Sequence, residues 1–241
     1  HMDRAISMYA LTGVGVCLPL IMIISAFAAL AGMGSAPRAS IYLGKNDKET
    51  AENILGNSTT LLFFIAVVLT FVMFYFAEDM LLLFGASENT ISYAVDYMKI
   101  YSLGTIFVQF TLGLNPFISA QGFAKTSMLT VLIGAICNII LDPIFIFAFN
   151  MGVSGAALAT IISQAISMIW ILWFLTGKKT TLKIRKKYLW LKPKIFLPCI
   201  ALGLSPFIMQ FTESVITICF NASLNKFGGD IAVSTMTILS S

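Results

Sequence analysis

The sequence predicts an all-α membrane protein built as a bundle of transmembrane helices. Hydrophobic residues make up 58% of its 241 residues and charged residues only 11%, whereas a soluble domain carries about 25% charged residues. The mean hydropathy is +0.91, and the apolar residues are gathered in long runs. No single core of a soluble protein can hide so much apolar surface.

Six apolar runs are long enough to form transmembrane helices, because a helix needs about 20 residues to cross the hydrocarbon core. They are residues 6–36, 59–77, 91–119, 127–149, 152–176 and 195–222. A seventh run begins near Ile231 and reaches the last residue after roughly ten positions, which are too few to cross a bilayer.

Three of the runs carry residues that suggest how the helices sit. In the third run, Asp96 and Lys99 are three residues apart near the outer interface, where we expect a local ion pair or snorkelling side chains. The fifth run opens with small residues that favour close helix packing, which are Gly152, Gly155, Ala156, Ala157 and Ala159. The fourth and sixth runs each contain a carboxylate, which a membrane span rarely tolerates without a function.

Basic residues predict the orientation of the chain. Lysine and arginine gather in the loops after the first, third and fifth runs, at residues 37–56, 120–126 and 177–194. By the positive-inside rule we expect these loops to be cytoplasmic, in a multi-pass protein of the cell membrane. This orientation places the start of the chain outside, so we expect a further helix upstream of it.

The segment from Lys178 to Lys194 is the richest in basic residues and mixes them with leucine, isoleucine and aromatic side chains. Such a mixture suits an interfacial amphipathic segment on the cytoplasmic leaflet. The simpler alternative is a basic connector between spans. A nucleic-acid partner is not expected, because no soluble module surrounds the segment.

Composition and motifs argue against an enzyme. The only His is residue 1, and the four Cys lie in apolar runs, where we expect small buried hydrophobes rather than metal ligands or disulfides. The sequence contains no HExxH or GxSxG motif and no Cys/His cluster. We therefore expect no catalytic residues, no organic cofactor and no metal ion other than sodium. We expect the lipid bilayer as a partner and no obligate protein partner.

Asp142 is the only acid or base in the run 127–149. A carboxylate there costs roughly 2.5–3.5 kcal/mol on insertion scales, so it usually faces a bundle interior or a wet cavity. Asn138 lies four residues earlier on the same helix face. We predict that the pair binds a coupling ion, either a proton or sodium, since Asn and Asp oxygens suit hard cations. Pro143 is expected to kink the helix, and the alternative role of Asp142 is to cap or hydrate that break.

Glu213 is the carboxylate of the sixth run, and Gln210 lies three residues before it on the same face. We predict that the two line a substrate or coupling cavity. An interhelical hydrogen bond is the competing interpretation, and Thr212 or Ser214 is equally suited to make one.

Asn115 and Gln164 are further cavity candidates, in the third and fifth runs. Asn115 precedes Pro116, where a polar side chain also serves to satisfy a broken helix. The same structural role is open to Gln164.

The beginning of the chain is similar to its end. Residues Asp3–Ser7 align with Asp230–Ser234, with three identities in five positions, and each copy precedes or opens an apolar helix. Duplicated halves are common in secondary transporters. Six helices per repeat predict a twelve-helix protein of two lobes.

Five stretches, taken in order, resemble helices of the multidrug and toxic compound extrusion (MATE) family. They are residues 32–54, Asn115–Gly122, Asn138–Pro143, Gly152–Thr160 with Gln164, and Pro206–Asn221 followed by GGDIAVS. The resemblance covers the whole chain, from the family's second helix to the start of its eighth. Gln121 is a departure, since family members often carry Arg there.

The resemblance implies a domain division and a function. Residues 1–177 would form most of the first lobe, 178–194 the cytoplasmic connector and 195–241 the start of the second lobe. The implied activity is export of cationic or hydrophobic small molecules in exchange for protons or sodium, by alternating access of the two lobes. The resemblance places Asp142 and Asn138 in the coupling site of the first lobe and Glu213 at the central cavity of the second.

Two alternatives to this function stay open. One is a flippase of related architecture for lipid-linked oligosaccharides, which a basic central cavity would favour. The other is an inactive fragment, because the resemblance implies that the family's first helix and most of its second lobe lie outside this chain.

Overall fold

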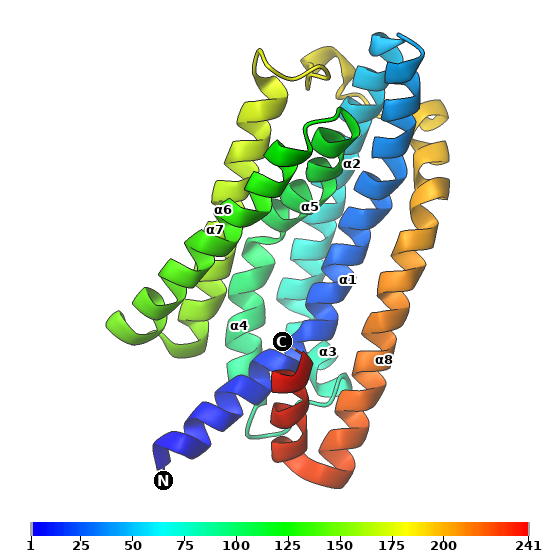
Figure 1. Cartoon of the computed structure of the whole chain (residues 1–241). Helices are drawn as coiled ribbons and strands as arrows, with labels where there is room; N and C mark the ends of the chain where they lie inside the picture. Colours follow the sequence, from blue (N-terminus) through cyan, green and yellow to red (C-terminus); the bar gives the residue numbers. More distant parts are fainter. Residues whose placement is uncertain (1, 241) are drawn as a thin grey trace.

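The structure is a computed structural model that describes the backbone of residues 2–240 and the side chains of residues 8–233 and 235–237. Its long helices run side by side in one bundle (Figure 1). The predicted repeat pairs Asp3–Ser7 with Asp230–Ser234, and the side chains of Asp3–Ser7 and Ser234 lie outside the described residues.

The described backbone is helical and contains no strand, which confirms the predicted fold class. The helices are α1 (Met2–Gly44), α2 (Lys48–Tyr75), α3 (Ala77–Leu83), α4 (Ile91–Leu103), α5 (Thr105–Ala120), α6 (Ala124–Pro143), α7 (Gly152–Thr176) and α8 (Pro193–Ser240). Two short turns join them: a π-helical turn at Ile144–Ala148 and a 3-10 turn at Lys186–Tyr188. In α8 the backbone breaks at Gly229, where φ is 64°.

Five described helices are long and apolar enough to cross a membrane, or six if α4 and α5 count as one span. This agrees with the six predicted runs, with one difference in shape. The third run is bent by 59° between α4 and α5. At the bend, Gly104 packs so close to Ile161 of α7 that a Cβ atom there would collide with its side chain.

The predicted loop at residues 37–56 is wrong in extent, because helix continues through most of it. Pro37 lies inside α1 without ending it, and only residues 45–47 separate α1 from α2. Asp47 caps α2 by accepting a hydrogen bond from the Thr50 backbone N–H at 3.0 Å. That bond holds the pKa of the Asp47 carboxyl below its usual range. Polar helix ends extend beyond the apolar run, so hydropathy alone places the boundary too early.

α1 is the central helix of the bundle and packs against α8, α5, α2 and α4. Its glycines allow backbones to touch. A Cβ atom on Gly34 would collide with the α8 backbone at Cys199 and Gly203, and one on Gly32 would collide with the α5 backbone at Gly113. Small residues at such crossings are typical of membrane helices.

The predicted close packing of the fifth run is also found. In α7, Gly155 lies against the backbone at Phe145, where a Cβ atom would be 2.8 Å from the Phe145 carbonyl carbon. Ala157 and Ala159 are fully buried. Gly152 instead serves a turn, with φ of 54° and open space around it.

Candidate functional site

Asp142 and Asn138 lie on the last turns of α6 and contact each other as predicted. The Asn138 amide donates a hydrogen bond to Asp142 Oδ1 at 3.2 Å. Asp142 is partly buried, and no lysine or arginine nitrogen among the described side chains lies within 4.0 Å of its carboxylate. The carboxylate therefore has an amide partner and no neutralising base.

Pro143 follows this pair and changes the helix without ending it. The chain continues from Pro143 into the π-helical turn Ile144–Ala148. Wide turns of this kind are frequent at functional sites in helices. The predicted break at Pro143 thus takes the form of a π-helical turn directly after the carboxylate.

A polar cavity of about 260 Å³ lies between α5, α6 and α7. It joins two of the predicted residues, Asn138 of α6 and Gln164 of α7. The other polar residues that line it are Thr111, Thr130, Thr160, Ser163 and Ser167. None of its lining residues is basic, so the cavity offers hydroxyl and amide groups beside the Asp142–Asn138 pair.

Hydrogen bonds around the cavity leave acceptor oxygens free. The Thr111 hydroxyl donates to the Gln164 carbonyl at 3.1 Å, and the Ser163 hydroxyl donates to the Ala159 carbonyl at 2.8 Å. Gln164 Oε1 is buried and accepts no hydrogen bond from any described residue. Since these hydroxyls already donate, what remains for a guest are lone pairs, which suit a cation with oxygen ligands.

Tyr97 of α4 extends this polar region and was missed by the sequence reasoning. It is buried, and it interacts with the Thr160 hydroxyl and electrostatically with Asp142. No local sequence signal marks Tyr97, which is one aromatic among many. The polar stripe of α7 does carry a signal, because Thr160, Ser163, Gln164 and Ser167 follow the spacing of one helix face.

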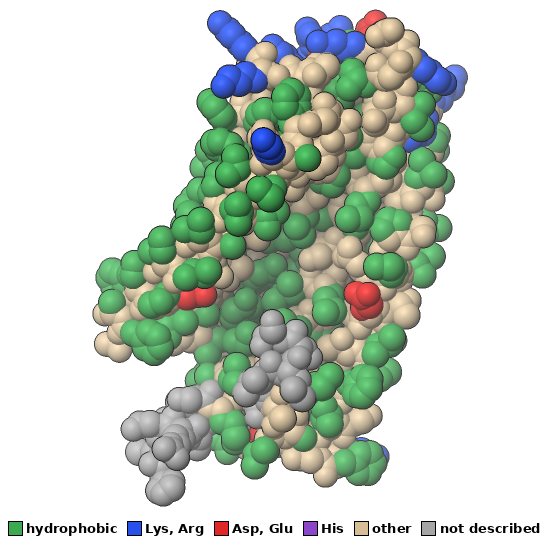
Figure 2. All heavy atoms as spheres, viewed as in Figure 1, with side chains coloured by type: hydrophobic (Ala, Val, Ile, Leu, Met, Phe, Trp, Pro, Cys, Tyr) green, Lys and Arg blue, Asp and Glu red, His purple; other side chains and the backbone are tan. Residues whose placement is uncertain are grey.

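Glu213 and Gln210 lie on α8 and do not line this cavity. The Glu213 side chain is exposed, and Gln210 is partly buried. Figure 2 shows a hollow between the α6–α7 side of the molecule and α8, with acidic side chains on both flanks. The neighbouring Ser214 makes the interhelical contact, donating a hydrogen bond to the Pro19 carbonyl of α1 at 2.9 Å. Glu213 is therefore not needed to hold α8 against α1.

Asn115 belongs to a different cavity, of about 600 Å³, between α1, α5 and α6. Its amide donates a hydrogen bond to the Ser127 carbonyl at 3.4 Å, and its Oδ1 atom is buried with no partner among the described residues. Pro37 and Pro116 also line this cavity. The predicted cavity residues thus fall into three places instead of one.

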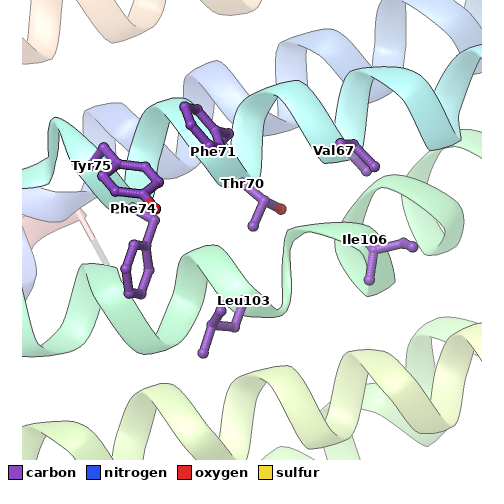
Figure 3. A pocket seen from close by; sticks show the side chains of 8 residues that line it. Val67, Thr70, Phe71, Phe74, Tyr75, Leu103 and Ile106 are labelled. Atoms are coloured by element: carbon purple, nitrogen blue, oxygen red, sulfur yellow. The ribbon is translucent and has the colours of Figure 1, made fainter.

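An apolar groove of about 410 Å³ lies on the outer surface at the α4–α5 bend. Figure 3 shows Val67, Phe71 and Phe74 of α2 near Leu103 and Ile106, with Thr70 among them. No acid or base lines the groove. It suits lipid chains and offers nothing to a charged ligand.

The basic residues gather at one end of the molecule, as predicted (Figure 2). There the connector, residues 177–192, contains only the short 3-10 turn and no amphipathic helix. Leu182 and Tyr188 are buried against the protein, whereas Trp190 is 79% exposed. The apolar side chains of the connector serve partly to dock it on the bundle, so the interfacial-helix expectation was wrong in form.

Comparison with known proteins connects this arrangement with membrane transporters. The family model described as MatE matches residues 4–144. Multidrug export protein MepA of Staphylococcus haemolyticus is 28% identical over 220 residues, which cover 91% of this chain and 49% of MepA. Probable multidrug resistance protein YoeA of Bacillus subtilis is 26% identical over 236 residues, covering 94% and 50%.

A solved structure shows the same fold. The structure of the MATE multidrug transporter DinF-BH in complex with a dye substrate matches with a TM-score of 0.90 and 35% identity. The match covers 96% of this chain and 52% of DinF-BH. The chain therefore spans about half the length of the proteins it resembles.

Proposed function

This chain belongs to the MatE family, and from that premise we propose that it is part of a secondary antiporter that exports organic cations in exchange for protons or sodium. The relatives named above are multidrug export, resistance or transport proteins, and one was solved with a dye substrate. The observation that carries the proposal is the carboxylate of Asp142, which lies in a membrane span beside a polar cavity and has no basic partner among the described side chains.

The proposed exchange is a competition for one negative charge. In its ionised form Asp142 attracts an organic cation that enters the cavity. When a proton binds the carboxylate, the negative charge is lost and the cation is released. A sodium ion would act in the same way, held by oxygens of Asp142, Asn138 and the Thr160 hydroxyl.

Direction requires that the site opens to one side of the membrane at a time. We propose that two lobes rock around the site, as in other transporters with duplicated halves, with residues 1–177 in one lobe and α8 opening the second. Glu213 on α8 would present a further carboxylate to the hollow between them. The basic end of the molecule, including the connector, would face the cytoplasm of a cell whose plasma membrane holds the protein.

The competing functions fit the site less well. A flippase for lipid-linked sugars would need bases to hold phosphate groups, and none lines the polar cavity. An enzyme would need reacting groups that the relatives' transport function does not call for. An inactive fragment is a matter for experiment, since the chain covers about half of its relatives.

The test is transport in proteoliposomes that contain either this chain alone or a two-lobe protein of the relatives' length that includes it. Export of tetraphenylphosphonium, a lipophilic cation, is followed under an imposed proton gradient and separately under a sodium gradient. We expect the two-lobe protein to respond to at least one gradient. If neither gradient drives export, the antiport proposal is wrong. Activity of the two-lobe protein without activity of the chain alone identifies the chain as one part of the machine.

A further inference from the structure

The connector is held rigidly against the end of the bundle. Its Arg185 pairs with Glu52 of α2, with Nε and Oε2 2.6 Å apart. Gln121, between α5 and α6, accepts three hydrogen bonds through one oxygen, from the Thr180 hydroxyl and from the backbone N–H groups of Thr181 and Leu182, at 2.8–2.9 Å. The start of the connector is therefore a fixed ledge next to the last turn of α7.

A groove of about 270 Å³ lies beneath this ledge. Trp173 and Phe174 of α7 form its walls, and Lys178 and Lys179 of the connector stand at its rim beside Gly177. Phe174 is buried, whereas Trp173 is 61% exposed. The groove thus joins two ammonium groups to an apolar wall.

The charge at this rim is not neutralised within the molecule. Among the described side chains, the carboxylates near the connector pair with Arg185 and Lys187, and none lies within 4.0 Å of Lys178 or Lys179. The carboxyl end of helix α7 and the positive-inside rule both favour lysines here. Those two effects explain the charge but require no apolar groove below it.

An apolar path leads from the groove along the outer face of α7. Ile166, Ile169 and Trp173 are spaced to lie on one side of the helix, and all three are exposed. In a membrane span such a face is covered by hydrocarbon chains. A ligand that carries an anionic head and a hydrocarbon tail would satisfy both the rim and the path.

We propose that the groove at the carboxyl end of α7 binds an anionic phospholipid of the leaflet that faces the connector. The phosphate contacts the ammonium groups of Lys178 and Lys179, and an acyl chain lies along Trp173 and Ile169. Basic pockets at the ends of transmembrane helices are a recognised way to bind acidic lipids. The rigid ledge keeps both lysines over the groove, so this site is local and differs from a diffuse attraction of the basic end to the membrane.

Tryptophan fluorescence tests the proposal directly, because Trp173 lines the groove. The chain has three tryptophans, so a variant with Trp170→Phe and Trp190→Phe keeps Trp173 as the single reporter. It is reconstituted in phosphatidylcholine vesicles that contain brominated phosphatidylglycerol or, at the same mole fraction, brominated phosphatidylcholine. Brominated chains quench an indole that they touch.

We expect Trp173 to be quenched more by the brominated phosphatidylglycerol, corresponding to a preference of roughly tenfold for the anionic lipid. Lys178→Gln with Lys179→Gln should abolish the preference, and Lys178→Arg with Lys179→Arg should retain it. The matched control, Lys45→Gln with Lys48→Gln, removes two charges from the same end of the bundle and should leave the preference unchanged.

Equal quenching of the reporter by the two brominated lipids overturns the proposal, and this result needs no lysine variant. The proposal also fails if the preference survives Lys178→Gln with Lys179→Gln, or if the control pair reduces it equally. In that last case the attraction is a property of the whole basic end.

Discussion

Glu52 and Asp142 are carboxylates at two regions of the molecule that treat a negative charge in opposite ways. Glu52, at the connector, has a side chain only 4% exposed and an arginine partner at 2.6 Å. Asp142, on α6 and beside the polar cavity, has only the Asn138 amide at 3.2 Å. A buried acid with a fitted base is part of the scaffold. An acid in a membrane span without one is free to bind a mobile cation.

The uncharged polar groups of the two regions repeat this difference. At the connector, Asn57 uses both ends of its amide, accepting from the Lys192 backbone N–H at 2.6 Å and donating to the Tyr188 carbonyl at 3.4 Å. At the cavity, Gln164 Oε1 is buried with no partner among the described residues. An unmade hydrogen bond is costly, so an unpaired acceptor beside Asp142 favours a cavity that receives a guest.

The largest expected effect is the loss of transport on removing the unpaired charge. Asp142→Asn keeps the size of the side chain and removes its attraction for cations. We expect export of tetraphenylphosphonium by the two-lobe protein to fall at least about tenfold, which corresponds to about 1.4 kcal/mol of lost attraction. Glu52→Gln is the control and should keep most of its transport per folded molecule. If the two variants fall equally, the distinction between the two regions is lost.

The next effect concerns stability and runs the other way. Glu52→Gln leaves Arg185 without its partner, and we expect the free energy of unfolding to fall by about 1–2 kcal/mol, moderated because Arg185 reaches water. Glu49→Gln is the matched control, since its side chain is 75% exposed and lies 3.7 Å from Lys187. That change should stay within about 0.5 kcal/mol. Thermal unfolding in detergent measures both, and equal losses would show that burial of the pair is irrelevant.

A smaller effect is expected from the π-helical turn after Asp142. Pro143→Ala restores a backbone N–H and favours a regular α-helix at this position by about 3 kcal/mol relative to proline. We expect a several-fold fall in export together with an altered dependence on pH, because the turn positions the carboxylate. Transport with an unchanged rate and pH profile would assign Pro143 no part in coupling.

Local patterns in the sequence predicted the features that depend on neighbouring residues. Hydropathy located the helices, and the spacing of four residues predicted the contact between Asn138 and Asp142. The bend at Gly104 escaped prediction because its cause is the close approach of Ile161, more than fifty residues away. The pair of Glu52 and Arg185 escaped for the same reason.

The candidate site was predicted in its chemistry more than in its geometry. Gln164 joined Asn138 in one cavity, whereas Asn115 and Glu213 occupy other places. Polarity in an apolar run marks each of these residues, but which side chains meet depends on how the helices pack. Tyr97 shows the converse, since only packing brings it near Asp142.

Equilibrium binding of tetraphenylphosphonium to the purified two-lobe protein tests most directly whether Asp142 exchanges cations. Affinity is measured across pH, with and without sodium, in the natural protein and in Asp142→Asn. We predict that protons or sodium weaken binding by the natural protein, and that the variant binds more weakly and responds to neither ion. A variant that binds with the same affinity and the same response to both ions would contradict the account.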